Sequence, residues 1–168
     1  MIDSLIYNQF ENFCKTASLF KNSFYELELF DLEDVCDDIN IDNLQIDINE
    51  NLENIPLGKR VEYFFDAIIQ QSPNHEKVLK NKQIIHNKLT LGEIDFILYN
   101  KKRKLYQHIE IQYKFYLYDH SIKDEISRYV GPSKNDSLIL KLEKLKNKQF
   151  PLLFKEETKE YLKSVDLR

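Results

Sequence analysis

Glycine is scarce in this sequence, which has only three glycines among 168 residues and no tryptophan. The three positions, Gly58, Gly92 and Gly131, lie far apart. A phosphate-binding loop or a dinucleotide-binding fingerprint needs several glycines within a few residues, because the backbone must approach the phosphates closely. We therefore expect no nucleotide cofactor.

Cysteine is equally rare, with Cys14 and Cys36 the only two. Neither has a His or a second Cys nearby at the spacing of a zinc site, so neither a zinc centre nor a disulfide framework is expected. We interpret both as buried or spare thiols, since a free cysteine behaves mainly as a small hydrophobic residue.

Long apolar segments are missing as well. The first residues, Met1–Leu5, lack the basic start and the apolar run of a signal peptide, and no later segment has the ~18 consecutive apolar residues of a membrane span. We expect a cytoplasmic protein with no membrane partner.

Charge is distributed unevenly along the chain. Residues 1–55 contain 13 acids and 2 bases, a net charge of −11, whereas residues 56–168 contain 15 acids and 22 bases, a net charge of +7. Summed charge steers partners over a surface, so a polyanion is a plausible partner for the second part only. We expect an acidic N-terminal extension, 1–55, that packs on a core domain, 56–168.

Hydrophobic periodicity predicts an α/β (α+β) fold. Helices are expected over residues 6–21, from Pro56 to Ser72, from Leu138 to about residue 148 and over Glu156–Lys163. Strands are expected over Gln83–Ile85, Gly92–Tyr99 and Lys104–Tyr118. Between Ile39 and Ile48 apolar residues nearly alternate with polar ones, as in an edge strand or an extended linker. The core is thus a helix, a three-stranded mixed sheet containing an antiparallel hairpin, and a second helix.

Carboxylates share one face of the expected hairpin. If Lys101–Lys104 is the hairpin loop, Asp95 lies opposite Glu110, and Glu93 lies opposite Gln112. Side chains alternate along a strand, so the intervening apolar residues form the other face, and His108 and Lys114 extend the polar one.

Two carboxylates that face each other destabilise a sheet unless positive charge lies between them, and Mg²⁺ is held by such oxygen ligands. In phosphodiester hydrolysis the cation polarises the phosphate and activates water, and Lys114 is close enough along the strand to assist. His108 would orient a site carboxylate. The alternative is a solvated sheet face that is neutralised by Lys114, His108 or Arg128.

Two segments, Thr90–Leu98 and His108–Leu117, resemble the metal-binding hairpin of the PD-(D/E)XK nuclease superfamily. Together with Val130-Gly131-Pro132, they resemble still more closely an uncharacterised bacterial family catalogued as domain of unknown function 1853, which itself resembles a PD-(D/E)XK branch. Further matching positions are Asp136, Lys141, Leu145 and Gln149. The resemblance covers roughly residues 56–153.

The resemblance implies a restriction-endonuclease-like core in which Asp95, Glu110 and the main-chain carbonyl of Ile111 bind Mg²⁺ or Mn²⁺. Glu62 matches a glutamate that many members add from the first helix, and its alternative is an exposed helical carboxylate. Gln112 stands where the motif has lysine, so Gln112 and Lys114 are alternative candidates for the third catalytic role. A final core strand is not evident before Arg168, so the core is expected to be short or truncated at its C-terminus.

Three lysines, Lys141, Lys144 and Lys148, form a basic stripe on the helix that follows the hairpin. Such a stripe is ordinarily a solvated face, but it suits phosphate contacts if the metal site exists. The sequence therefore supports two hypotheses. One is a Mg²⁺-dependent nuclease acting on DNA or RNA. The other is a catalytically inactive nuclease-fold domain that binds nucleic acid or protein.

Overall fold

The computed structural model describes residues 4–20, 23–37 and 52–165. The chain folds into two compact units. The first comprises residues 1–79 and 97–113, and the second comprises residues 80–96 and 114–168. The first unit therefore contains both the acidic N-terminal part and the helix that begins the predicted core. The near-alternating segment between Ile39 and Ile48 lies outside the described residues.

Helices α1 (Ser4–Cys14), α2 (Leu32–Asp37) and α3 (Leu57–Gln71), with a short 3-10 turn at Leu52–Asn54, belong to the first unit. The α3 prediction is confirmed at both ends, since Pro56 precedes its first residue and Ser72 follows its last. Helix α1 ends earlier than predicted. Beyond it, the Thr16 hydroxyl donates to the carbonyl of Asn12 over 2.7 Å, a local bond that competes with continuation of the helix.

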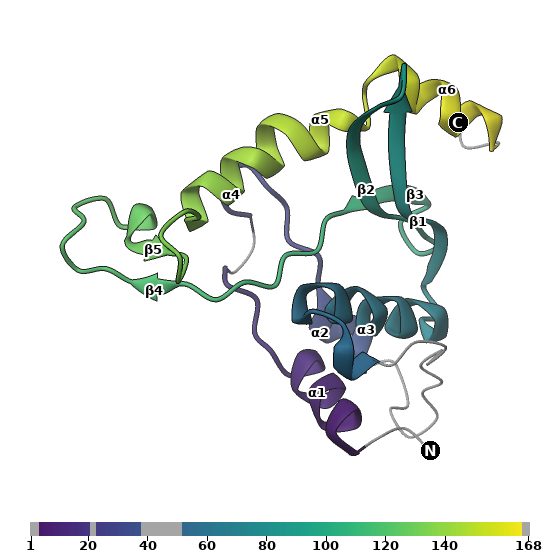
Figure 1. Cartoon of the computed structure of the whole chain (residues 1–168). Helices are drawn as coiled ribbons and strands as arrows, with labels where there is room; N and C mark the ends of the chain where they lie inside the picture. Colours follow the sequence, from purple (N-terminus) through teal and green to yellow (C-terminus); the bar gives the residue numbers. More distant parts are fainter. Residues whose placement is uncertain (1–3, 21–22, 38–51, 166–168) are drawn as a thin grey trace. The chain divides into compact units, whose positions relative to one another are not determined.

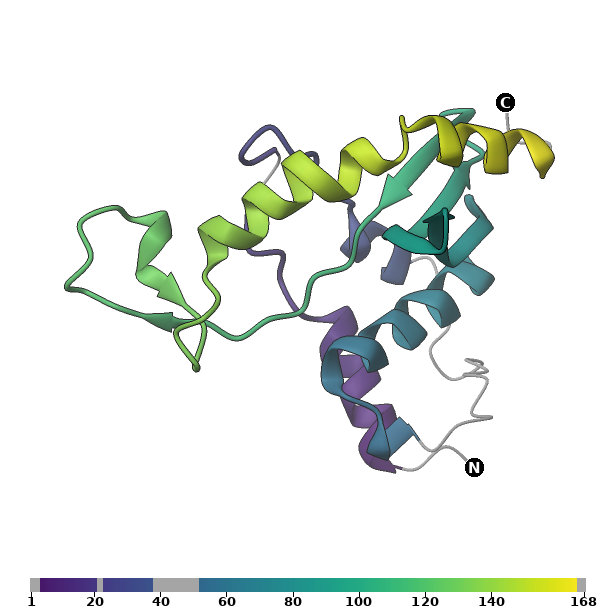
Figure 2. The same cartoon turned by 45° about the horizontal axis from the view of Figure 1, so that its top comes forward.

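The core of the first unit forms where α1 meets α3 (Figures 1 and 2). Phe64 of α3 is 1% exposed, and its ring contacts Phe10 edge-on, with 5.6 Å between centroids, and Phe13 at 5.9 Å. Phe10 and Phe13 lie about one turn apart on α1, so both rings face the same ring of α3. Aromatic packing therefore joins the acidic N-terminal part to α3.

Three strands, β1 (His75–His86), β2 (Leu89–Asn100) and β3 (Leu105–Ile109), form a sheet in the order β1-β2-β3. Asn87 and Lys88 join the first two strands with φ values of 48° and 65°, the conformation of a type I′ hairpin turn. Residues 101–104 join the next two, as predicted. Because both connections are tight hairpins, the sheet is antiparallel throughout, where a mixed sheet was expected.

The apolar face of β2 is confirmed, since Ile94, Phe96 and Leu98 are each 0% exposed. Toward the end of the strand Asn100 continues this face at 8% exposure, and Ile97 on the opposite face is also buried, at 4%. The first half of β2 therefore has one covered face, and its second half is covered on both.

The third strand is much shorter than predicted, because β3 ends at Ile109 rather than continuing to Lys114 and beyond. The next strand, β4 (Leu117–Tyr118), belongs to a separate two-stranded sheet with β5 (Tyr129–Val130), in which Leu117 pairs with Val130. Polar and apolar residues alternate from His108 to Phe115, without a break where β3 ends. Alternation predicts an extended chain but does not reveal where the chain changes partner.

The helices after β5 belong to the second unit and follow one another in a nearly straight path (Figures 1 and 2). They are α4 (Leu138–Lys144), a π-helical turn (Leu145–Gln149), α5 (Phe150–Leu152) and α6 (Glu156–Ser164). Ser137 caps α4, since its hydroxyl accepts from the amide of Leu140 at 3.4 Å. Both helix predictions are confirmed, but the π-helical turn was not predicted. Within the described ranges no helix is long and apolar enough to cross a membrane.

Candidate functional site

Glu110, the central predicted site residue, lies one residue beyond the end of β3. Its side chain is 0% exposed, and its Oε1 lies 2.8 Å from Nε2 of His108, whose own side chain is 6% exposed. A carboxylate removed from water is costly unless it is hydrogen-bonded and paired with positive charge. The ring of His108 supplies a donor to this carboxylate, and strand alternation puts both side chains on the same face.

Asp95, the second predicted carboxylate, lies in β2 between two fully buried residues, Ile94 and Phe96. Asp95 itself is half-buried, which agrees with the predicted alternation of faces. Glu93, two residues earlier, accepts from Nε2 of Gln83 over 3.3 Å. Strand β2 is the neighbour of β3 in the sheet, so carboxylates are carried at the polar positions of β2 and directly after β3.

The two candidates for the third catalytic role lie outside regular strands. Gln112 is exposed and follows the end of β3. Lys114 donates to Oδ2 of Asp136 over 3.1 Å, with both side chains substantially exposed. Lys114 therefore has an acidic partner on the loop before α4. Strand parity, which placed Lys114 two residues beyond Gln112 on the same face, did not predict this contact.

Glu62 lies in α3 and accepts from Nζ of Lys59 over 2.6 Å. Its side chain is 15% exposed, so it is more covered than the exposed helical carboxylate that the sequence offered as the alternative. Its contact with Lys59 is a local one between neighbouring turns of the helix. Its participation in a metal site stays a prediction.

The donors fit a hard divalent cation in kind, because Asp95 and Glu110 supply carboxylate oxygens and Ile111 supplies a main-chain carbonyl. Across the described part of the chain, no three His, Cys, Asp or Glu side chains gather to hold a metal ion. Such a group is the rule for zinc but not for Mg²⁺, which commonly uses one or two carboxylates and keeps several waters.

A Ser–His–Asn cluster that the sequence analysis missed joins the end of α3 to β1 and β2. Ser72 Oγ lies 3.0 Å from Nδ1 of His75, and Nδ2 of Asn100 lies 3.2 Å from its Nε2. The amide of Arg103 donates to Oδ1 of Asn100, which leaves the Asn100 amide nitrogen to donate to His75. His75 therefore carries its proton on Nδ1 and donates to Ser72. A base that already donates to the hydroxyl cannot activate it, so the cluster is structural.

Burial, followed by the nearby charges of Lys102, Arg103 and Lys101, lowers the pKa of His75 below its ordinary value. The imidazole is therefore neutral at pH 7, in agreement with this hydrogen-bond pattern. No signal in the sequence identifies the cluster, because its members are 28 positions apart at most and meet only through the hairpin.

The two cysteines also meet. A hydrogen bond with the side chain of Cys36 lowers the pKa of the Cys14 thiol, which is half-buried, whereas Cys36 is buried. Helix α1 thus contacts α2 partly through sulfur, and Cys14 and Cys36 are not joined by a disulfide.

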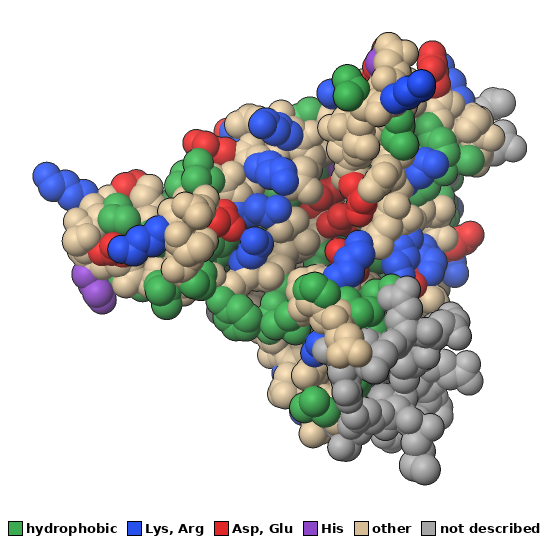
Figure 3. Space-filling view, in the orientation of Figure 1, with side chains coloured by type: hydrophobic (Ala, Val, Ile, Leu, Met, Phe, Trp, Pro, Cys, Tyr) green, Lys and Arg blue, Asp and Glu red, His purple; other side chains and the backbone are tan. Residues whose placement is uncertain are grey.

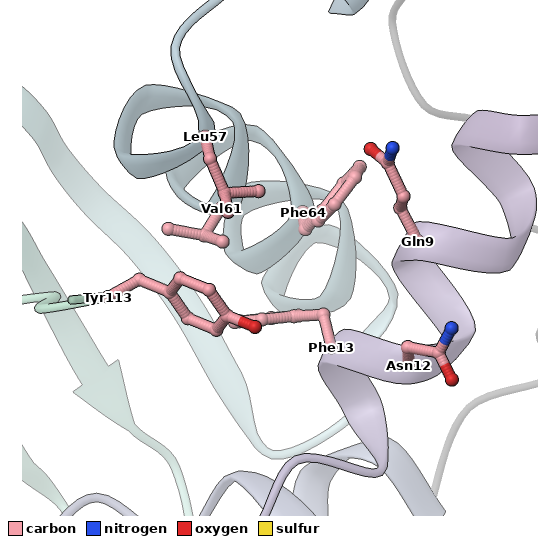
Figure 4. Close-up of a pocket in the computed structure, with 7 residues that line it drawn as sticks. All are labelled: Gln9, Asn12, Phe13, Leu57, Val61, Phe64 and Tyr113. Atoms are coloured by element: carbon pink, nitrogen blue, oxygen red, sulfur yellow. The ribbon is translucent and has the colours of Figure 1, made fainter. Parts of the chain in front are cut away.

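A small pocket of about 210 Å³ lies between α1 and α3 (Figure 4). Its floor is apolar, with Phe13, Val61 and Phe64, and its rim carries the polar ends of Gln9 and Tyr113. None of the predicted catalytic or metal-binding residues lines it. It is therefore distinct from the candidate site.

Lysines gather along α4, where Figure 3 shows a group of basic side chains. Lys141 donates to Oε1 of Gln149 over 3.4 Å, while Lys144 and Lys148 are exposed. In a regular α-helix, residues eight apart are rotated by about 80° from each other. The wider π-helical turn at Leu145–Gln149 reduces this rotation and brings Gln149 to the side of Lys141. The predicted basic stripe therefore lies on a helix in which the π-helical turn changes the direction of the side chains that follow α4.

These features define a mixed α/β domain with an antiparallel three-stranded sheet and a carboxylate held at the end of one strand. The family described as domain of unknown function (DUF1853) matches residues 28–168, and the chain belongs to this family. The match begins within the acidic N-terminal part, well before the start at residue 56 that the sequence resemblance indicated. No curated protein and no solved structure matches the chain.

Proposed function

We propose that this protein is a Mg²⁺- or Mn²⁺-dependent nuclease that hydrolyses phosphodiester bonds of DNA or RNA. The observation that carries the proposal is the carboxylate of Glu110, shielded from water and held by His108 directly after β3. The adjacent strand, β2, carries Asp95 at a half-buried polar position. The resemblance of these two segments to the PD-(D/E)XK hairpin supports the same assignment.

In this proposal Asp95, Glu110 and the main-chain carbonyl of Ile111 hold the cation, and Glu62 joins them from α3. A bound cation supplies Lewis-acid polarisation of the phosphate and a water of lowered pKa. Gln112 would orient the attacking water through its amide. Lys114 would offset the charge that develops on the phosphate if it exchanges its contact with Asp136 for the substrate.

The test is cleavage by the full chain. Supercoiled plasmid, single-stranded DNA and RNA are each incubated with the protein in Mg²⁺, in Mn²⁺ and in EDTA. We expect cleavage of at least one substrate with metal and none with EDTA, since the carboxylates alone provide no Lewis acid. Intact substrates under every metal condition would refute the enzyme proposal.

The lysines of α4 and the π-helical turn provide the surface for substrate phosphates in this proposal. Lys141, Lys144 and Lys148 replaced together by glutamine should weaken binding of nucleic acid and reduce its salt dependence. The plot of log K against log salt has a negative slope. Each lost phosphate interaction should make this slope shallower by roughly 0.7 to 0.9. Fluorescence anisotropy at several salt concentrations measures this slope. Lys159 and Lys163 of α6, changed to glutamine in the same way, are the matched control and should leave the slope unchanged.

The contact of Lys114 with Asp136 favours a second candidate function. If Lys114 stays on Asp136, and Gln112 provides no charge in its place, the domain would bind nucleic acid without cleaving it. Retained, lysine-dependent binding with no cleavage would support this second function and exclude the first.

A further inference from the structure

We infer that His108 is a positioning residue that fixes the carboxylate of Glu110 for cation binding. This inference rests on the proposed function. It begins from the contact between His108 Nε2 and Glu110 Oε1, 2.8 Å long, in which the two side chains are 6% and 0% exposed. The contact between Lys114 and Asp136, by comparison, joins side chains that are 50% and 36% exposed.

The strand boundary explains why such a residue is needed. His108 lies within β3, whose ladder with β2 holds its backbone, whereas Glu110 lies just beyond the last residue of the ladder. After Glu110 the chain leaves the sheet, and its next strand pairs with β5. Glu110 thus lies outside the ladder, one residue past the strand. A side-chain contact to a residue that is still in the strand ties its carboxylate to the sheet.

The contact with His108 also determines the orientation of the Glu110 carboxylate. The histidine contacts one oxygen of the carboxylate, Oε1, through Nε2. A hydrogen bond to one oxygen of a ligating carboxylate fixes the plane of the group and reduces the freedom that metal binding must remove. Substitution of such an outer partner typically weakens metal binding by about 10- to 100-fold.

Two substitutions separate positioning from simple packing. His108→Gln keeps a nitrogen donor near the place of Nε2, whereas His108→Leu fills similar space without a donor. Titration of each full-length variant with Mn²⁺, followed by melting temperature and by calorimetry, gives the metal dissociation constant without relying on turnover. We expect His108→Leu to bind Mn²⁺ at least about 10-fold more weakly than the wild type, and His108→Gln to stay within about 3-fold.

Controls keep the result decisive. His86→Leu removes a histidine that lies 3.5 Å from Glu157 at an exposed site, and it should leave Mn²⁺ affinity unchanged. If His108→Leu does not fold, His108→Asn takes its place, because its donor is too short to reach Oε1, and it should bind Mn²⁺ more weakly than His108→Gln.

Three outcomes overturn the inference. Wild-type affinity in His108→Leu or in His108→Asn means that the histidine only packs. Equal weakening in His108→Gln and His108→Leu means that the donor is not what matters. An absence of any Mn²⁺ response in the wild type removes the proposed metal site itself, and this inference with it.

Discussion

Asp95→Asn and Glu110→Gln are each expected to reduce metal-dependent cleavage by at least about 100-fold, the effect typical when one preorganised electrostatic contact to a transition state is removed. Both substitutions keep the side-chain volume and remove one negative charge from the cation site. The reduction should appear in the rate at saturating Mg²⁺, measured on whichever substrate the wild type cleaves.

Glu143→Gln is the matched control for these variants, because Glu143 is an exposed carboxylate on α4 that belongs to no proposed site. It should retain wild-type activity. An Asp95→Asn or Glu110→Gln variant that cleaves as fast as Glu143→Gln would mean that its carboxylate does not hold the catalytic cation.

Hydrophobic periodicity predicts an element of this fold correctly where the pattern of apolar residues fits only one kind of secondary structure. Helix α3 is such an element, because Val61, Phe64 and Ile68 repeat at helical spacing between a proline and a Ser-Pro pair. The alternating half of β2 is another, since Ile94 and Phe96 are buried and Asp95 between them is not. In both cases the local preference and the buried face agree.

The pattern fails where the same extended chain serves two sheets. Polar and apolar residues alternate from His108 to Phe115, yet β3 ends at Ile109 and β4 begins at Leu117. The choice between β2 and β5 as the partner depends on hydrogen bonds with residues distant in sequence, which alternation does not encode. The start of β1 was missed for a related reason, because its polar residues hide the strand before Gln83.

For the candidate site, strand parity correctly predicted that His108 and Glu110 lie on one side. Parity gives a direction but no rotamer, so it did not predict that Lys114 contacts Asp136 or that Glu62 contacts Lys59. Long charged side chains have many rotamers, and the acidic group nearest in space selects among them. The ligand roles of Asp95 and Glu110 stay predictions that only metal can test.

Millimolar Mg²⁺ or Mn²⁺ is expected to raise the melting temperature of the wild type. A ligand that binds only the folded state at about 100 times its Kd stabilises it by roughly 2.7 kcal/mol. For a chain of this size that corresponds to about 5–10 °C, measured by calorimetry or dye fluorescence with EDTA as the reference. Asp95→Asn and Glu110→Gln should both abolish the metal-dependent increase.

Without metal, the same two variants should shift the melting temperature in opposite directions. Asp95→Asn should raise the metal-free melting temperature, because it removes the repulsion that the proposed site places on its empty carboxylates. Glu110→Gln should lower it, since it weakens a buried, charge-assisted hydrogen bond with His108, a contact worth about 1.5–3 kcal/mol. Parity alone predicts an increase for both, because it treats both acids as empty metal ligands. A solvated, salt-bridged sheet face instead predicts no metal shift in the wild type and a metal-free decrease for Asp95→Asn as well, so one set of melting curves decides between the two descriptions of this face.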